Sequence, residues 1–132
     1  MDTGSVPKAK VLIVDDQDQM REFLRAALKT LPVQIVEMNN GMEAMTLIET
    51  EQPDLLLTDY LMPGWDGLTL CQDLRRRTDL KPVKTVLITG ETTLALLLEA
   101  VNHGVVDAAL AKPVDMHELQ KLVKRLLALD QS

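Results

Sequence analysis

The sequence predicts an α/β fold in which a five-stranded parallel sheet carries helices on both faces, and two observations favour it. Short apolar runs at residues 11–14 and 55–57 are typical of strands that are buried on both sides. Longer segments between such runs have apolar residues at helical spacing. Regular alternation of strands and helices is typical of a parallel sheet that is covered on both faces.

Each predicted element has a local signal. Pro32 ends the first helical segment, Pro53 closes the loop that follows the second, and Asn39-Asn40-Gly41 predicts a turn after the second strand. Asp115 and Glu118 form a capping-box pair for the last helix. We expect strands at 11–14, 33–36, 55–57, 83–88 and 108–111, and helices at 19–31, 42–50, 68–77, 92–103 and from 115 onward. The predicted core face of the last helix comprises Met116, Leu119, Leu122, Val123 and Leu126.

The chain has the length of one domain. Its 132 residues leave no room for a second core. We predict a flexible lead-in at 1–9, a single domain at 10–129 and a short tail at 130–132. No apolar segment is long enough to span a bilayer, so a soluble cytoplasmic protein without membrane contact is expected.

The net charge and the cysteine content exclude further classes of partner and structure. The net charge of −6 gives DNA no electrostatic attraction, so no direct nucleic-acid contact is expected. Arg75, Arg76 and Arg77 are interpreted as a solvated helix end that complements the helix dipole. Cys71 is the only cysteine, which excludes an internal disulfide, and its apolar neighbours predict a place in the core.

Polar residues follow four of the five predicted strands. Asp15 and Asp16 follow the first strand, Asp59 the third, Thr89 the fourth and Lys112 the fifth. Because the carboxyl ends of parallel strands meet at one edge of a sheet, these side chains should converge. Crowded carboxylates repel one another, and a hard divalent cation such as Mg²⁺ would relieve this. With a metal and a lysine nearby, a carboxylate can accept a phosphoryl group.

The ordered set of motifs resembles the signature of response-regulator receiver domains of two-component signal transduction. The motifs are Val-Asp15-Asp16, Asp59-Tyr-Leu-Met62-Pro63-Gly-Trp-Asp66-Gly67, Thr89-Gly90 and Lys112-Pro113. The likeness covers the chain from about Lys10 to Leu129. It implies a doubly wound, flavodoxin-like (βα)5 fold with strand order 2-1-3-4-5.

The resemblance also implies roles for the motif residues. Asp59 would be the phosphoacceptor, and Mg²⁺ would be bound by Asp16, Asp59 and the backbone carbonyl of Leu61, with Asp15 acting through water. Lys112 would bridge to the phosphoryl group, and Thr89 would swing toward it after transfer. The loop after the acceptor would be shaped by Met62, Pro63, Asp66 and Gly67, and Gly67 would let the backbone turn into the next helix. Pro113, after a cis peptide bond, would hold the loop that carries the lysine.

The family takes its phosphoryl group from a histidine kinase or phosphotransfer protein and signals to an output domain or partner. Such a module is not an enzyme in the turnover sense, although it assists its own phosphorylation and dephosphorylation. His103 and His117 are predicted surface residues and not phosphodonors. The helix from Thr92 to His103 is rich in leucine, so Leu96 or a neighbour should be exposed and available for docking or for a phosphorylation-dependent homodimer. Alternatively, this helix is buried more deeply than usual.

Two positions depart from the family pattern. Ala109 stands where receivers usually have an aromatic side chain that rotates on phosphorylation, so the change should instead travel through Thr89 and the neighbouring loop and helix. Leu61 offers the hydrolytic water no hydrogen bond, which predicts a long-lived phosphoaspartate.

Three alternatives stay open at this point. The aspartates, and Thr89, could merely cap helices. The chain could be a degenerate receiver that acts as a constitutive docking scaffold. It could also be a small Mg²⁺-dependent phosphatase with an aspartyl-phosphate intermediate, although Leu61 stands where that chemistry normally needs an acid.

Overall fold

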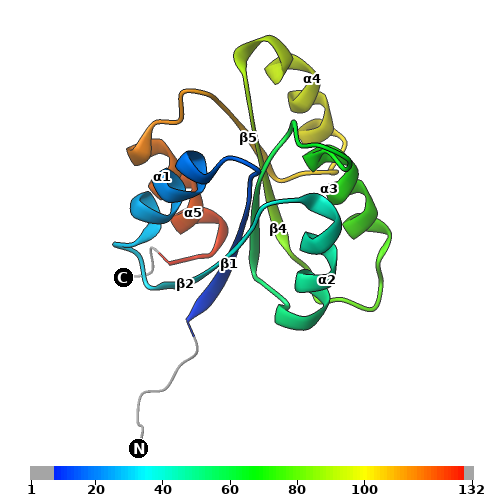
Figure 1. Ribbon diagram of the computed structural model, residues 1–132, viewed down its shortest axis with the longest axis horizontal. Helices are drawn as coiled ribbons and strands as arrows, with labels where there is room; N and C mark the ends of the chain where they lie inside the picture. The colour runs from blue at the N-terminus through cyan, green and yellow to red at the C-terminus, as the bar shows by residue number, and fades with distance from the viewer. Residues whose placement is uncertain (1–7, 130–132) are drawn as a thin grey trace, which may run out of the picture.

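The computed structural model describes residues 8–129, apart from the side chains of residues 91 and 92, and contains a sheet of five parallel strands (Figure 1). The strand order is β2-β1-β3-β4-β5, so the predicted fold class and strand order are confirmed. The strands are β1 (Ala9–Val14), β2 (Val33–Met38), β3 (Leu55–Asp59), β4 (Lys84–Thr89) and β5 (Ala108–Ala111). The helices are α1 (Asp18–Leu28), α2 (Gly41–Glu51), α3 (Gly67–Arg76), α4 (Glu91–Asn102) and α5 (Met116–Leu126).

Two hydrophobic cores lie on opposite faces of the sheet. Helices α1 and α5 cover one face, and α2, α3 and α4 cover the other (Figure 1). Because successive side chains of a strand point to opposite faces, β1 gives Val11 and Ile13 to the first core and Leu12 and Val14 to the second. Cys71 is buried in the second core, as predicted. The sheet is thereby fixed from both sides.

Two details of the helices differ from the predictions. Helix α1 ends at Leu28 and not at residue 31, because the residues ahead of Pro32 leave the helical conformation in a turn that keeps Leu31 buried. Met116 is 38 % exposed, so its predicted place in the core is wrong. It is the first residue of α5, and helix side chains lean toward the N-terminus, which directs Met116 past the core that Leu119 and Val123 fill.

Arg75 and Arg77 at the end of α3 contact other elements, which corrects their interpretation as part of a merely solvated helix end, whereas Arg76 is exposed as interpreted. Arg75 donates from Nε to the Val105 carbonyl (2.9 Å) and from Nη2 to Asp107 Oδ2 (3.1 Å). Arg77 pairs with Glu49 at the end of α2. The start of β5 and the end of α2 lie within reach of α3, a placement that the local sequence does not reveal.

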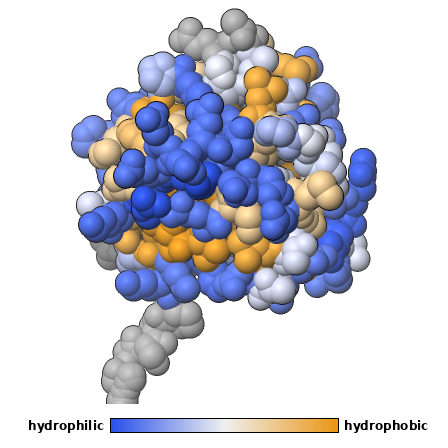
Figure 2. Space-filling model, viewed as in Figure 1, coloured by the Kyte–Doolittle hydropathy of each residue, from blue (hydrophilic) through white to orange (hydrophobic). Residues whose placement is uncertain are grey.

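The surface of α4 carries apolar side chains. Leu96 is 54 % and Leu98 is 45 % exposed, so the expectation of an exposed leucine is confirmed and the more deeply buried alternative is wrong. Most of the face in Figure 2 is hydrophilic, but apolar side chains also gather near its top, where Figure 1 draws α4.

Strand β1 begins at Ala9, the last residue of the predicted lead-in; residues 1–7 and the predicted tail at 130–132 lie outside the described residues. Within 8–129, no helix is long and apolar enough to cross a membrane.

Candidate functional site

Three aspartates meet at the carboxyl edge of the sheet. Asp59 ends β3, and Asp15 and Asp16 follow β1, which is the neighbouring strand. Each aspartate offers a carboxylate oxygen within 4.8 Å of those of the other two. Asp15 and Asp59 are buried and Asp16 is exposed. The predicted convergence of the acidic residues is present in the structure.

Only one of the two Asp15 carboxylate oxygens accepts a hydrogen bond from residues 8–129. Its Oδ1 accepts a hydrogen bond from the Gln17 backbone N–H (2.9 Å), whereas its buried Oδ2 has no hydrogen-bond partner among residues 8–129. Burial raises the pKa of the Asp15 carboxyl, the Gln17 hydrogen bond opposes this, and the nearby Asp59 charge adds to it. A buried carboxylate oxygen without a donor is well suited to face a cation.

Lys112 places a positive charge next to Asp59. Its Nζ lies 3.1 Å from Asp59 Oδ1, and its backbone N–H donates to the Thr89 carbonyl at 2.7 Å. The Lys112–Pro113 peptide bond is cis. One ammonium group cannot balance three ionised carboxylates, so the cluster retains negative charge that a divalent metal ion would neutralise.

The loop after Asp59 is held at both of its ends. The Tyr60 N–H donates to the Ile88 carbonyl and the Gly67 N–H to the Tyr60 carbonyl, both at 2.8 Å. Asp66 caps α3 by accepting from the Thr69 N–H at 2.7 Å. In between, the side chain of Met62 is buried, whereas Pro63 and Leu61 are exposed, Leu61 to 66 %. The contacts of the Leu61 carbonyl with a metal stay a prediction.

Gly67 matters for a reason other than the one predicted. Among the glycines of the described chain, positive φ angles occur at Gly64 and Gly104 and not at Gly67. A Cβ at Gly67 would instead lie 2.3 Å from the Asp59 carbonyl oxygen and 2.8 Å from Leu87 Cδ2. The start of α3 therefore packs directly on the backbone of Asp59, and close approach, not a turn, requires glycine here.

Thr89 is buried at the end of β4, and its hydroxyl contacts the hydroxyl of Thr93 in the first turn of α4. Ala109 lies on β5, opposite Leu87 of β4, and packs against the core beneath α4. The position where the resemblance leads us to expect an aromatic side chain therefore holds a methyl group.

Helix capping does not explain the site residues. The N-caps of the five described helices are Gln17, Asn40, Asp66, Gly90 and Asp115. None of Asp15, Asp16, Asp59 or Thr89 is among them, so the capping alternative is wrong. The predicted cap Asp115 is confirmed, and Asp66, predicted only to shape the loop, also caps a helix.

A family model described as "Response regulator receiver domain" matches residues 11–124. The chain belongs to the response-regulator receiver family. In Escherichia coli K12, the "DNA-binding transcriptional regulator NtrC" is 33 % identical over 118 residues, which are 89 % of this chain and 24 % of NtrC. "Probable transcriptional regulator ycf27" of Cyanophora paradoxa is 31 % identical over 92 % of this chain and 49 % of its own length.

A solved structure shares the fold. The receiver domain of a signal transduction histidine kinase from Syntrophus aciditrophicus superposes with a TM-score of 0.81 at 31 % identity, covering 93 % of this chain and 92 % of that one. The present chain spans about half the length of ycf27 and about a quarter of NtrC.

Two residues at the receiver site escaped sequence analysis. Arg21 of α1 donates from Nη1 to the Asp15 carbonyl (2.6 Å) and so holds the first acidic loop. Thr93 contacts Thr89; the only signal in the sequence is its place one helical turn further along the chain. His103 and His117 are exposed, as predicted.

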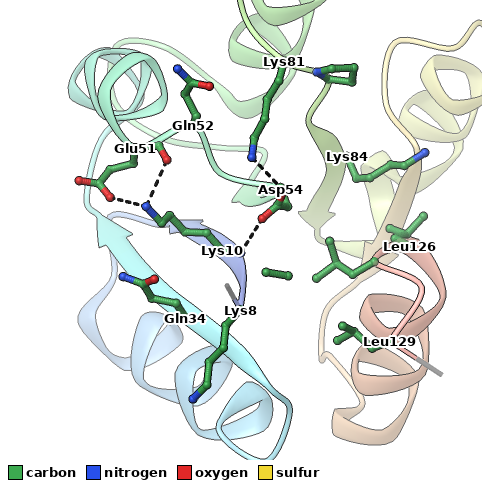
Figure 3. A pocket seen from close by; sticks show the side chains of 13 residues that line it. Lys8, Lys10, Gln34, Glu51, Gln52, Asp54, Lys81, Lys84, Leu126 and Leu129 are labelled. Carbon is green, nitrogen blue, oxygen red and sulfur yellow. Dashed lines mark hydrogen bonds and ion pairs between the residues drawn. The ribbon is translucent and has the colours of Figure 1, made fainter. Parts of the chain in front are cut away.

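A cavity of about 790 Å³ lies at the opposite edge of the sheet (Figure 3). Lys10 Nζ donates to Glu51 Oε1 (2.8 Å), and Lys81 Nζ donates to Asp54 Oδ1 (3.0 Å). These cations already have acidic partners in the cavity wall. The residues that line this cavity do not include the three aspartates, so it is separate from the acidic site.

Proposed function

We propose that this receiver domain accepts a phosphoryl group on Asp59 from the phosphohistidine of a histidine kinase or phosphotransfer protein. The main support is the ammonium of Lys112, 3.1 Å from the buried carboxylate of Asp59, in a cluster with Asp15, whose Oδ2 has no hydrogen-bond partner among residues 8–129. In the transfer, an Asp59 oxygen bonds to phosphorus as the phosphorus–nitrogen bond breaks. The histidine nitrogen keeps the electron pair.

The carboxylate cluster fits Mg²⁺, because its ligand atoms are all oxygens and Asp15, one of its members, has a buried oxygen without a donor among residues 8–129. Asp16, Asp59 and the Leu61 carbonyl would bind the ion directly, and Asp15 through water. Bound Mg²⁺ would neutralise oxygens of the transferring group. Lys112 would hold another phosphoryl oxygen by its ammonium, and Thr89 would donate its hydroxyl to a third.

Phosphorylation would then shift an equilibrium between two conformations and so regulate an output domain or a partner. Exposed Leu96 and Leu98 make α4 the candidate docking surface, for a partner or for a second phosphorylated copy. We infer that the domain is cytoplasmic, where a histidine kinase would phosphorylate it. Relatives include a DNA-binding regulator, but the charge of −6 supports no direct DNA contact by this domain.

Incubation with Mg²⁺ and acetyl phosphate is expected to add one phosphoryl group to the wild type, measured by intact mass. Asp59→Asn should gain none, and EDTA should prevent the gain. Asp79→Asn is the control, because this exposed carboxylate belongs to a loop beyond α3 and should not affect labelling. No gain by a folded protein that binds Mg²⁺ would contradict the proposal and favour a docking scaffold.

The phosphorylated protein should lose its label faster when Leu61 is replaced by asparagine. An amide at this exposed position can hydrogen-bond an attacking water, and one hydrogen bond corresponds to about a two- to tenfold higher rate. The decay of the phosphorylated mass after removal of acetyl phosphate measures the rate. Leu61→Met changes the side chain without adding a strong donor, so equal decay of the two variants would refute the role of the hydrogen bond.

A further inference from the structure

Helix α4 begins without the side-chain cap that fixes three of the other helices. Asn40, Asp66 and Asp115 each accept a backbone N–H of the helix they precede. The N-cap of α4 is Gly90, which has no side chain to do so. Glycine also leaves the joint between β4 and α4 more adaptable than any other residue would.

The first turn of α4 is instead joined to the acidic site through Thr93. Its hydroxyl donates to the Gly90 carbonyl (3.2 Å) and contacts the Thr89 hydroxyl. Thr89 also accepts, at its carbonyl, the N–H of Lys112, whose ammonium lies at Asp59. A short chain of contacts thus leads from the phosphoacceptor to α4.

Strand β5 gives the core beneath α4 no side chain that could rotate. Leu97 and Ala100 are the buried residues by which the described part of α4 contacts the sheet. The β5 residue on this face is Ala109, and a methyl group has no alternative rotamer. A signal from Thr89 to α4 therefore needs a different side chain.

We propose that Thr93 is a positioning residue that holds Thr89 in its unphosphorylated orientation and releases the first turn of α4 after phosphorylation. This inference rests on the proposed phosphorylation of Asp59. The Thr89 hydroxyl has a single proton, and when that proton is donated to a phosphoryl oxygen it no longer serves Thr93. Thr93 then keeps only its bond to Gly90, and α4 can shift its exposed leucines.

Removal of the Thr93 hydroxyl should favour the phosphorylated conformation, because the lost hydrogen bond exists only in the unphosphorylated one. Beryllium fluoride with Mg²⁺ mimics the phosphoryl group without a covalent bond and can be titrated. Thr93→Val is expected to bind it about two- to tenfold more tightly than the wild type. Thr93→Ser, which keeps the hydroxyl, should restore wild-type affinity.

Thr50→Val is the matched control, because Thr50 also donates its hydroxyl within its own helix, to the Leu47 carbonyl (3.2 Å), but on α2. It should bind beryllium fluoride like the wild type. Hydrogen exchange provides the second measurement: amides in the first turn of α4 should exchange faster in the unbound Thr93→Val protein and in the wild type with beryllium fluoride.

The outcomes separate this inference from the proposed function. Wild-type binding that is lost in Asp59→Asn, together with unchanged or weaker binding by Thr93→Val, would overturn the role of Thr93 alone. Absence of binding by the folded wild type with Mg²⁺ would overturn the proposed function, and the role of Thr93 with it.

Discussion

Replacement of Gly67 by alanine is expected to lower the free energy of unfolding by about 3 kcal/mol. The new Cβ would lie 2.3 Å from the Asp59 carbonyl oxygen and 2.8 Å from Leu87 Cδ2. The first is backbone of β3, the central strand of the sheet, and the second is a packed core side chain, so neither can move cheaply. Urea denaturation followed by circular dichroism measures the loss.

The same variant should also impair the site, because the clash displaces the backbone that carries the phosphoacceptor. We expect labelling by acetyl phosphate to slow about tenfold or more under conditions where the variant is still folded. Gly90→Ala is the stability control, since no atom lies within 4 Å of its added Cβ. It should cost less than about 1 kcal/mol. Equal stability of the two variants would show that the backbone at Gly67 gives way easily.

Gly67 also illustrates what the sequence could and could not predict. Its place just before the apolar residues of the predicted helix at 68–77 indicates a helix start, and α3 begins at Gly67 itself. The sequence nevertheless predicts that glycine is needed here for a turn, because it does not reveal that α3 begins in contact with the Asp59 carbonyl. That contact depends on how a helix sits across a sheet.

The acidic site was predictable because it follows from the order of strands and helices along the chain. In a parallel sheet, residues just after the strands must share one edge, so the positions of Asp15, Asp59 and Lys112 in the sequence are enough to bring them together. Arg21 and Thr93 could not be predicted, because their side chains reach the site from helices. Their contribution depends on rotamer and helix position, which local patterns do not encode.

The Asp15→Asn variant is expected to be more stable than the wild type at neutral pH without Mg²⁺, by about 1 kcal/mol. The pKa of Asp15 is raised from 3.8, chiefly by burial, so the folded state disfavours the ionised form. The stability associated with Asp15 is therefore complete below pH 3.8 and is lost as the pH rises through the higher pKa of the folded state. The higher stability of the asparagine variant should accordingly vanish in acid. Urea denaturation of both proteins at neutral pH and below pH 3.8 would show this.

Mg²⁺ should reverse this order, because the charge that destabilises the metal-free protein is the charge that attracts the cation. Saturating Mg²⁺ stabilises the folded state according to its affinity, and Asp15→Asn removes one of three carboxylates, so thermal unfolding should shift less in the variant. Asp79→Asn is the control: Arg77 lowers the pKa of Asp79 to about 2, so neutralisation there should bring no gain in stability and no change in the Mg²⁺ response. An Asp15→Asn protein that is less stable without Mg²⁺, yet equally stabilised by it, would mean that this carboxylate serves the fold and not the metal.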